Sequence, residues 1–113
     1  MIECPVNYAL SILSGKWKLY IVWLLTQEKV IRFNEMQRRA DGISAIMLSK
    51  CLQELENDKI IIRKDYHENP PKVEYTLSDL GIALEPALLS LGKWGELAYK
   101  VLSTSKKNTS GHT

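Results

Sequence analysis

The segment from residue 60 to residue 77 constrains the fold most, because two short apolar-rich runs flank a pair of prolines there. Ile60–His67 and Lys72–Leu77 both have the length of a strand, and the second alternates apolar with polar residues. Pro70 and Pro71 lie between them and have no N–H to donate to a sheet. The segment therefore predicts a β-hairpin with a stiff, proline-containing tip.

The residues before this hairpin predict a series of short helices and one minimal strand. Ser44 is the expected cap of the last of these helices, with Ile43 and Leu48 placed to pack across its first turn. The expected elements are helices over Tyr8–Leu13 and Lys16–Leu25, a strand over Val30–Phe33, a helix from Asn34 as its cap to about Ala40, and a helix from Ser44 to about Asn57. Helix, turn, helix and hairpin in this order form a winged helix-turn-helix, an α+β fold that is mostly helical.

A last helical stretch follows the hairpin. Ser78 is expected to cap it, Pro86 to kink or split it, and its apolar pattern ends near Leu102. Residues 103–113 are polar and without periodicity, so we expect them to form a disordered tail. The chain is thus predicted to hold one domain, residues 1–102, and a tail, residues 103–113.

The helix from Ser44 to Asn57 has two contrasting sides on a helical wheel. Four residues fall on its apolar side and are expected in the core: Leu48, Cys51, Leu52 and Leu55. In a winged helix this second helix enters the major groove, where Gln pairs with adenine and Lys with guanine. The predicted DNA-reading residues lie at the start and on the outer side of the helix: Ser44, Ala45, Ile46, Ser49, Lys50 and Gln53. A solvated polar face without a ligand is the alternative for the helix taken alone.

Basic residues flank this helix on both sides, within a segment from Lys16 to Lys72 that carries eleven basic and eight acidic residues. Such groups contact phosphates and position a protein on DNA without reading its sequence. The predicted phosphate and wing contacts are Arg38 and Arg39 at the end of one helix, and Arg63, Lys64, His67 and Lys72 on the hairpin. A winged helix that binds protein instead of DNA is the competing interpretation, but such modules usually lose these flanking charges.

Several motifs resemble one known family in their order and spacing, over roughly residues 4 to 99. The matching segments are Cys4–Val6, Gly15–Leu19, Arg32–Glu35, Gly42–Ser44, Met47–Leu48, Leu52–Glu56, Pro70–Leu77, Leu80–Gly81 and Trp94–Gly95. The chain resembles the HxlR-type winged helix-turn-helix transcriptional regulators, which are close to the MarR group. The resemblance implies a homodimer that binds a palindromic double-stranded operator, and we expect a repressor. Two departures are Ala45-Ile46, where the family usually has polar or basic residues, and Lys59, where it usually has Gly.

The last helical stretch predicts a dimer independently of the resemblance. Its apolar positions recur at helical spacing and are too many for one small domain to cover. The expected dimerisation residues are Leu84, Leu88, Leu91, Trp94 and Leu97, and the first helix is expected to join them. The alternative is that this helix folds back onto its own core.

The two cysteines are expected to differ in role. Cys4 precedes a helix whose N–H groups and dipole favour a thiolate, and the resemblance implies that Cys4 senses oxidants or electrophiles. A small unreactive cysteine is the alternative for Cys4, whereas Cys51 is expected to pack in the core. With two cysteines and two histidines in the whole chain, we expect no metal site.

No sequence motif indicates catalysis or a cofactor. The six glycines fit neither a dinucleotide fingerprint nor a P-loop, and a Cys-x-x-Cys pair is missing, so we expect neither an enzyme nor a bound cofactor. No apolar run approaches the ~20 residues of a membrane span, and the N-terminus does not resemble a signal peptide. We therefore expect a cytoplasmic protein without membrane contact. A small-molecule effector near Trp17, Tyr20 and Trp94 is left open.

Overall fold

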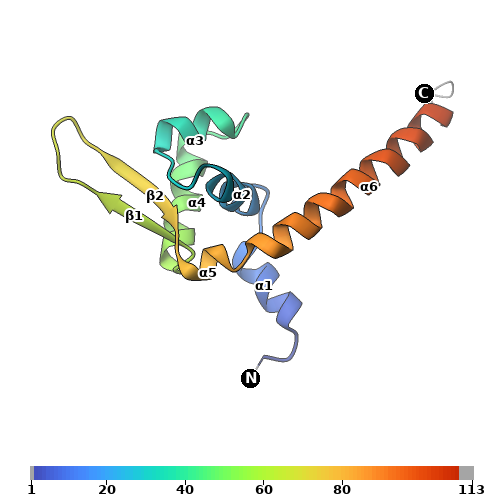
Figure 1. Ribbon diagram of the computed structural model, residues 1–113, viewed down its shortest axis with the longest axis horizontal. Coiled ribbons are helices and arrows are strands. Elements are labelled where there is room, and N and C mark those ends of the chain that lie inside the picture. The colour runs from blue at the N-terminus through green and yellow to red at the C-terminus, as the bar shows by residue number, and fades with distance from the viewer. Residues whose placement is uncertain (1, 110–113) are drawn as a thin grey trace. The chain divides into compact units, whose positions relative to one another are not determined.

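The computed structural model describes residues 2–109 and divides the chain into two compact units, Met1–Ala83 and Leu84–Thr113 (Figure 1). The first unit holds four helices, a two-stranded sheet and a short fifth helix; the second is one long helix. In chain order the elements are α1 (Pro5–Leu13), α2 (Lys18–Glu28), α3 (Phe33–Arg39), α4 (Ala45–Asn57), β1 (Ile61–Asp65), β2 (Val73–Leu77), α5 (Asp79–Ile82) and α6 (Glu85–Thr109). This is the predicted winged helix-turn-helix, mostly helical, with a hairpin as its wing.

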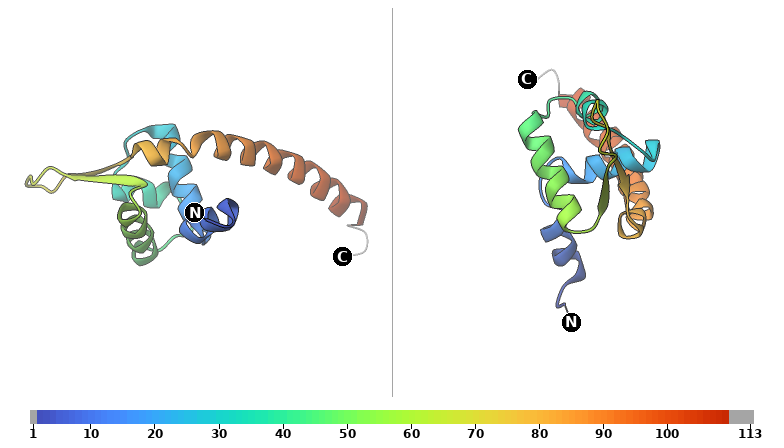
Figure 2. Two further views of the ribbon diagram at one scale, coloured as in Figure 1. Left: turned by 90° about the horizontal axis from the view of Figure 1, so that it is seen from below. Right: turned by 90° about the vertical axis from the view of Figure 1, so that its left-hand side faces the viewer.

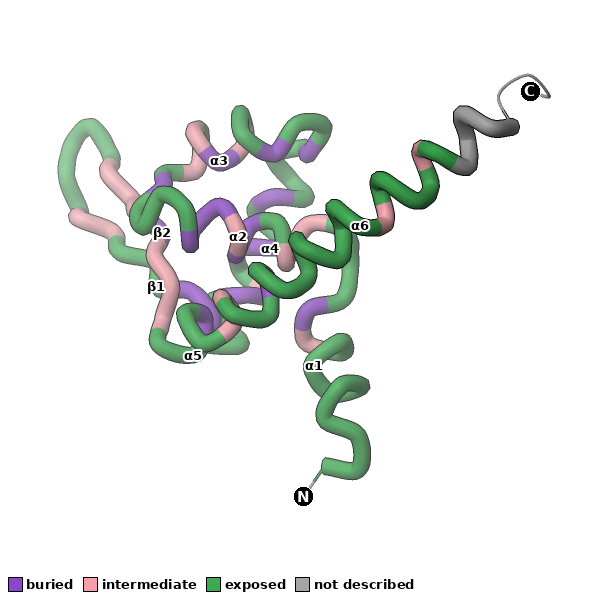
Figure 3. The backbone as a smooth tube through the Cα atoms, turned by 45° about the vertical axis from the view of Figure 1, so that its right-hand side comes forward, coloured by how far each residue is buried: buried purple, intermediate pink, exposed green. Residues whose placement is uncertain are grey.

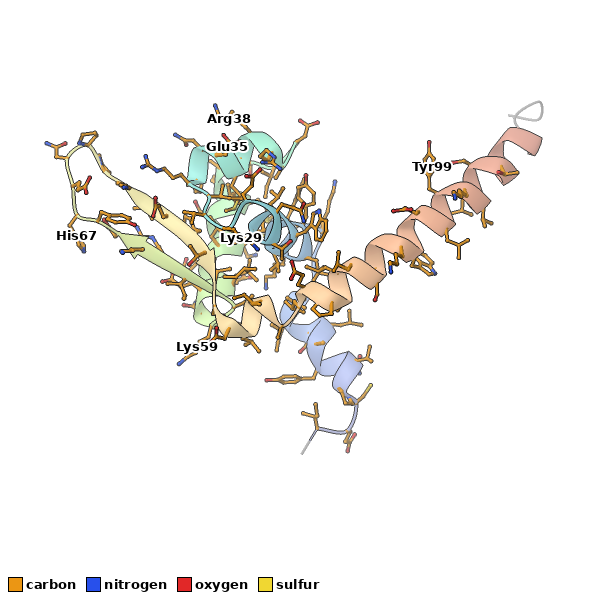
Figure 4. All side chains as sticks on the ribbon, in the orientation of Figure 1. Lys29, Glu35, Arg38, Lys59, His67 and Tyr99 are labelled. Carbon is orange, nitrogen blue, oxygen red and sulfur yellow. The ribbon has the colours of Figure 1, made fainter. Side chains whose placement is uncertain are left out.

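The recognition-helix candidate α4 begins where the sequence predicts. The Ser44 hydroxyl oxygen accepts a hydrogen bond from the backbone N–H of Met47 at 3.0 Å, which confirms the cap. Ile43 and Leu48, the two residues of the predicted staple, are both buried. Just beyond the end of α4, Lys59 has a φ of 62°, the left-handed conformation that glycine adopts more easily (Figure 4).

The hairpin is antiparallel, and its two strands are shorter than expected. Its register pairs Ile61 with Leu77 and Asp65 with Val73, so each strand has five residues. The tip extends beyond the helices, while α4 lies beside the base of the hairpin (Figure 2). The predicted wing is therefore confirmed, with a longer tip loop.

Two expectations for the segment before α3 are wrong. Val30–Phe33 does not form a strand: Ile31 alone bridges to Tyr75, because α3 already begins at Phe33. Asn34 is not the cap, since it lies inside α3; Arg32 holds the capping position without any side-chain hydrogen bond.

The core of the first unit lies between α2, α3 and α4. Its largest fully buried side chains come from these three helices. Figure 3 shows buried segments of the same helices in purple. They are Ile21, Val22, Leu25, Met36, Leu48 and Leu55. The helix pair of the helix-turn-helix therefore packs on α2, with α4 held along one side.

The residues after the hairpin are tied to the end of α4. The Ser78 hydroxyl accepts from the Gly81 N–H at 3.1 Å and donates to the Lys59 carbonyl at 2.6 Å, so Ser78 caps α5 as predicted. A Cβ on Gly81 would overlap the carbonyl oxygen of Ile60. Only glycine permits this close approach of the two backbones.

The last helical stretch is split, as Pro86 suggested, but the break precedes the proline. α5 ends at Ile82, and Pro86 is the second residue of α6, where a missing N–H costs nothing. The helix does not end near Leu102, since α6 runs to Thr109 and includes much of the predicted tail. Residues 110–113 of that tail lie outside the described residues. No described helix is long and apolar enough to span a membrane.

Candidate nucleic-acid interface

The outer side of α4 is the centre of the candidate interface. All six residues expected to read DNA are exposed: Ser44, Ala45, Ile46, Ser49, Lys50 and Gln53. Ile46 is 84% exposed, which is unusual for its size and suits contact with an apolar group such as the thymine methyl. The opposite side of α4 buries Leu48, Cys51, Leu52 and Leu55, as predicted. The helix thus presents one polar, hydrogen-bonding side from a fixed position.

A buried lysine that the sequence analysis missed helps to hold α4. The Lys18 ammonium lies 2.8 Å from a carboxylate oxygen of Glu54 on α4, and it donates to the Ile12 carbonyl at 3.2 Å. Lys18 is only 8% exposed, although α2 otherwise looks like an apolar helix. This ion pair lowers the pKa of Glu54, chiefly through the hydrogen bond from Lys18. One side chain therefore joins α1, α2 and α4.

The two arginines predicted at the end of α3 are both exposed and both paired. Arg38 binds Glu35 one turn earlier (Figure 4). Arg39 lies 2.6 Å from a Glu28 oxygen, and this hydrogen bond raises the pKa of Arg39. The pairing turns Arg39 toward α2, whereas Arg38 stays on the surface of its own helix.

The basic residues of the wing lie on two different faces. Arg63 is opposite Tyr75 in the register and 3.9 Å from Asp65. Lys64 and Lys72 share the other face, because Lys64 is opposite Glu74 and the Tyr66 N–H binds the Lys72 carbonyl. The four wing residues expected to contact DNA therefore form two separate groups, with exposed His67 at the tip (Figure 4).

Tyr66, another residue that sequence analysis missed, organises one of these groups. The ammonium groups of Lys64 and Lys72 lie 4.7 Å and 4.4 Å from the centre of its ring. Its hydroxyl donates to a Glu74 oxygen at 2.6 Å, and this bond raises the pKa of Tyr66. In the sequence, the only sign of this arrangement is that Tyr66 follows Lys64 by two residues and so lies on the same face of the predicted strand. The contact between Tyr66 and Lys72 cannot be inferred from that spacing.

The two cysteines differ as expected in exposure. Cys4 is exposed and caps α1, its sulfur accepting from the Asn7 N–H at 3.4 Å. Cys51 is buried on α4, and burial followed by the charge of Glu54 raises the pKa of its thiol. Neither is in a disulfide. Among the described residues, no group of three or more His, Cys, Asp or Glu side chains is placed to hold a metal ion.

The candidate dimerisation residues divide by exposure. Leu91, Trp94 and Leu97 are 51%, 63% and 58% exposed on α6, whereas Leu88 is buried and Leu84 is half-buried just before the helix begins. α6 therefore presents large apolar side chains to solvent.

Two of the hollows on the first unit are lined by candidate residues. One, of about 340 Å³, is lined by Lys16, Trp17, Tyr20, Arg39 and Asp41, so it includes two of the three residues considered for an effector. The other, of about 520 Å³, lies where α3 meets the wing.

Comparison with known proteins shows the family. The model of the HxlR-like helix-turn-helix matches residues 12–102. The chain belongs to this family. The regulatory protein MalR of Fusobacterium mortiferum is 44% identical over 94 residues, which cover 83% of this chain and 89% of MalR. The HTH-type transcriptional regulator YybR of Bacillus subtilis is 42% identical over 105 residues, covering 93% of this chain and 83% of YybR.

Solved structures of family members have the same fold. The redox regulator HypR in its reduced form has a TM-score of 0.83 and 40% identity, covering 89% of this chain and 99% of that chain. Its oxidised form has a TM-score of 0.76 and 43% identity, over 82% and 95% of the two chains. The chain is thus a transcriptional regulator of the helix-turn-helix type and not an enzyme.

Proposed function

We propose that this regulator binds double-stranded DNA as a homodimer, with α4 of each subunit in a major groove. The exposed polar side of α4 carries this proposal, because it combines donors and acceptors for base edges with a buried side that fixes the helix. The phosphate contacts that flank it come mainly from Arg63, Lys64, His67 and Lys72. Arg38 and Arg39 contribute less, because Glu35 and Glu28 hold them. Because it acts on DNA, we place the protein in the cytoplasm.

Exposed apolar side chains on α6, and separately on α1, support the proposed dimer. Large exposed apolar side chains that gather on one helix of a small protein mark an association site. On α6 these residues are Leu89, Leu91, Trp94, Leu97, Val101 and Leu102, and on α1 they are Val6, Tyr8 and Leu10. A symmetric dimer would present two copies of α4, which favours a palindromic operator with half-sites about one helical turn apart.

Selection of duplexes from a random pool, followed by anisotropy titration, tests DNA binding without knowledge of the operator. We expect the wild type to prefer a selected palindrome over a scrambled duplex by about 10³-fold or more. Lys50→Ala should weaken binding and relax the preference at one base pair of each half-site, since Lys50 reads a base edge. Lys59→Asn, which also removes one lysine but lies beyond the end of α4, should leave the base preference unchanged.

Two results of this selection bear on the proposal. If no duplex is enriched and the wild type binds none at low salt, then DNA binding is wrong and the winged helix is a protein-binding module. If binding occurs, a reporter with the selected palindrome across its promoter decides the sign of regulation, and we expect repression.

We further propose that Cys4 makes binding sensitive to oxidants or electrophiles. Cys4 is exposed at the start of α1, whereas Cys51 is buried, and the family members of known structure include a redox regulator. N-ethylmaleimide should therefore modify Cys4 first and change the affinity for the selected palindrome in wild type and in Cys51→Ser. Cys4→Ser should keep its affinity under the same treatment; an equal change in Cys4→Ser would contradict the proposal.

A further inference from the structure

The hollow of about 520 Å³ lies where the two DNA-directed parts of the first unit meet. Its lining comes from the residues that lead into α3 and from the wing, with Arg32 and Asn34 on one side and Pro71 and Val73 on the other. The bridge between Ile31 and Tyr75 fixes these two sides relative to each other through hydrogen bonds of 3.0 and 3.1 Å. Backbone hydrogen bonds therefore hold the two sides of the hollow in place.

The proposed docking places a charged strand at this part of the surface. One sugar–phosphate strand separates the major groove from each neighbouring minor groove. If α4 lies in the major groove and the wing follows the adjacent minor groove, that strand crosses the protein between the helix-turn-helix and the wing. The hollow is lined by the first residues of α3 and by the start of β2. Figure 1 shows these two elements beside each other.

The charges around the hollow suit an anion. Arg32 is exposed, and among the described residues it makes no salt bridge. Arg38 also lines the hollow, but its guanidinium binds Glu35. From the wing, the hollow is lined by Pro71 and Val73, neither of which carries a charge. One cation is thus left free in the hollow.

We propose that this hollow receives a phosphodiester of the DNA strand between the two grooves, and that Arg32 is its principal contact. The inference rests on the proposed DNA binding and adds a residue that the sequence analysis did not assign. Asn34 supplies a neutral donor, and Glu35 limits the affinity because its carboxylate faces the same hollow.

Arg32→Ser tests the contribution of the Arg32 charge to DNA binding. It removes the charge, and Ser is a better cap than Arg for a helix whose capping residue makes no side-chain hydrogen bond, so α3 should not unfold. On the selected palindrome, the slope of log K against log salt should fall by about 0.9 per half-site. Arg32→Lys should retain the slope, and Glu35→Gln should strengthen binding several-fold.

Neutral methylphosphonates placed one at a time in the selected palindrome locate the contact. In wild type, substitution of the strand between the two grooves should weaken binding several-fold; in Arg32→Ser the same substitution should have no effect, while other positions remain sensitive. An identical sensitivity profile in both proteins, or an unchanged salt slope, overturns the inference and leaves DNA binding intact. Failure of the wild type to bind any duplex overturns both.

Discussion

α4 and α6 are both amphipathic helices, yet their apolar side chains have different surroundings. On α4, Leu48 and Leu55 are completely buried within the first unit. On α6, Trp94 and Leu97 are more than half exposed, although they recur at the same helical spacing. Amphipathicity thus shows that a helix has an apolar side that packs against another surface. It does not show whether that surface belongs to the same chain or to a second copy.

Truncation of a core residue of α4 should have the largest effect on stability. Leu55→Ala removes a side chain with 0% exposure and leaves a cavity, so the free energy of unfolding should fall by about 2–5 kcal/mol. Urea denaturation followed by circular dichroism measures it. Ile46→Ala, on the exposed side of the same helix, should stay within about 0.5 kcal/mol of wild type. Equal losses in both variants would mean that the two sides of α4 do not differ.

The corresponding change on α6 should affect association. Trp94→Ala removes a large exposed apolar side chain, and we expect the dimer dissociation constant to rise by about 30-fold or more, as for a central interface residue. Sedimentation velocity over a range of concentrations measures it, with Lys93→Ala as the control on the neighbouring side of α6. A dimer equally tight in Trp94→Ala would place the interface elsewhere.

The link between α4 and α2 should make stability depend on acidic pH. The pKa of Glu54 is lowered in the folded state by Lys18, so the pair contributes stability above the ordinary value of 4.5. That contribution is lost as the pH falls through the lowered pKa. Urea denaturation of wild type and Glu54→Gln at pH 7 and pH 3 should show a difference at pH 7 that shrinks at pH 3. A constant difference would exclude the pair as its cause.

The smallest expected change is a gain at the end of α4. Lys59 adopts a left-handed conformation, so Lys59→Gly should raise the free energy of unfolding by about 1 kcal/mol. Thermal and urea denaturation measure it. Lys64→Gly, in a strand, should instead destabilise the protein; a loss in Lys59→Gly would show that the lysine side chain compensates for its backbone.

The fold was largely predictable because its signals are local. The cap at Ser44, the apolar side of α4 and the hairpin around Pro70-Pro71 each depend on a few neighbouring residues, and the structure confirms all three. The errors lie where a distant contact intervenes. The segment before α3 pairs with the hairpin only through Ile31, which bridges to Tyr75, and α3 begins two residues later with Arg32 in the capping position.

The exposure of the candidate DNA-binding residues follows from the sequence, but their grouping does not. Lys64 and Lys72 look like two independent cations in the sequence, yet the hairpin register brings both to the ring of Tyr66. The sequence did not point to Lys18 as a buried residue, because periodicity does not show that Glu54 and a carbonyl are near enough to satisfy a buried ammonium. Arg32 is recognisable in the sequence only as part of a family motif, because the sequence does not show the hollow that it lines.

The sequence by itself determined the order of the elements, the family and the side of α4 that faces outward, since these follow from propensity, periodicity and motifs over short distances. Only the tertiary structure decided which charges are paired and which are free. Arg39 on α3 is held by Glu28 on α2, and Lys18 on α2 by Glu54 on α4, whereas Arg32 makes no salt bridge among the described residues. The physical reason is that an ion pair depends on a few ångströms of separation, which the packing of helix against helix and strand sets.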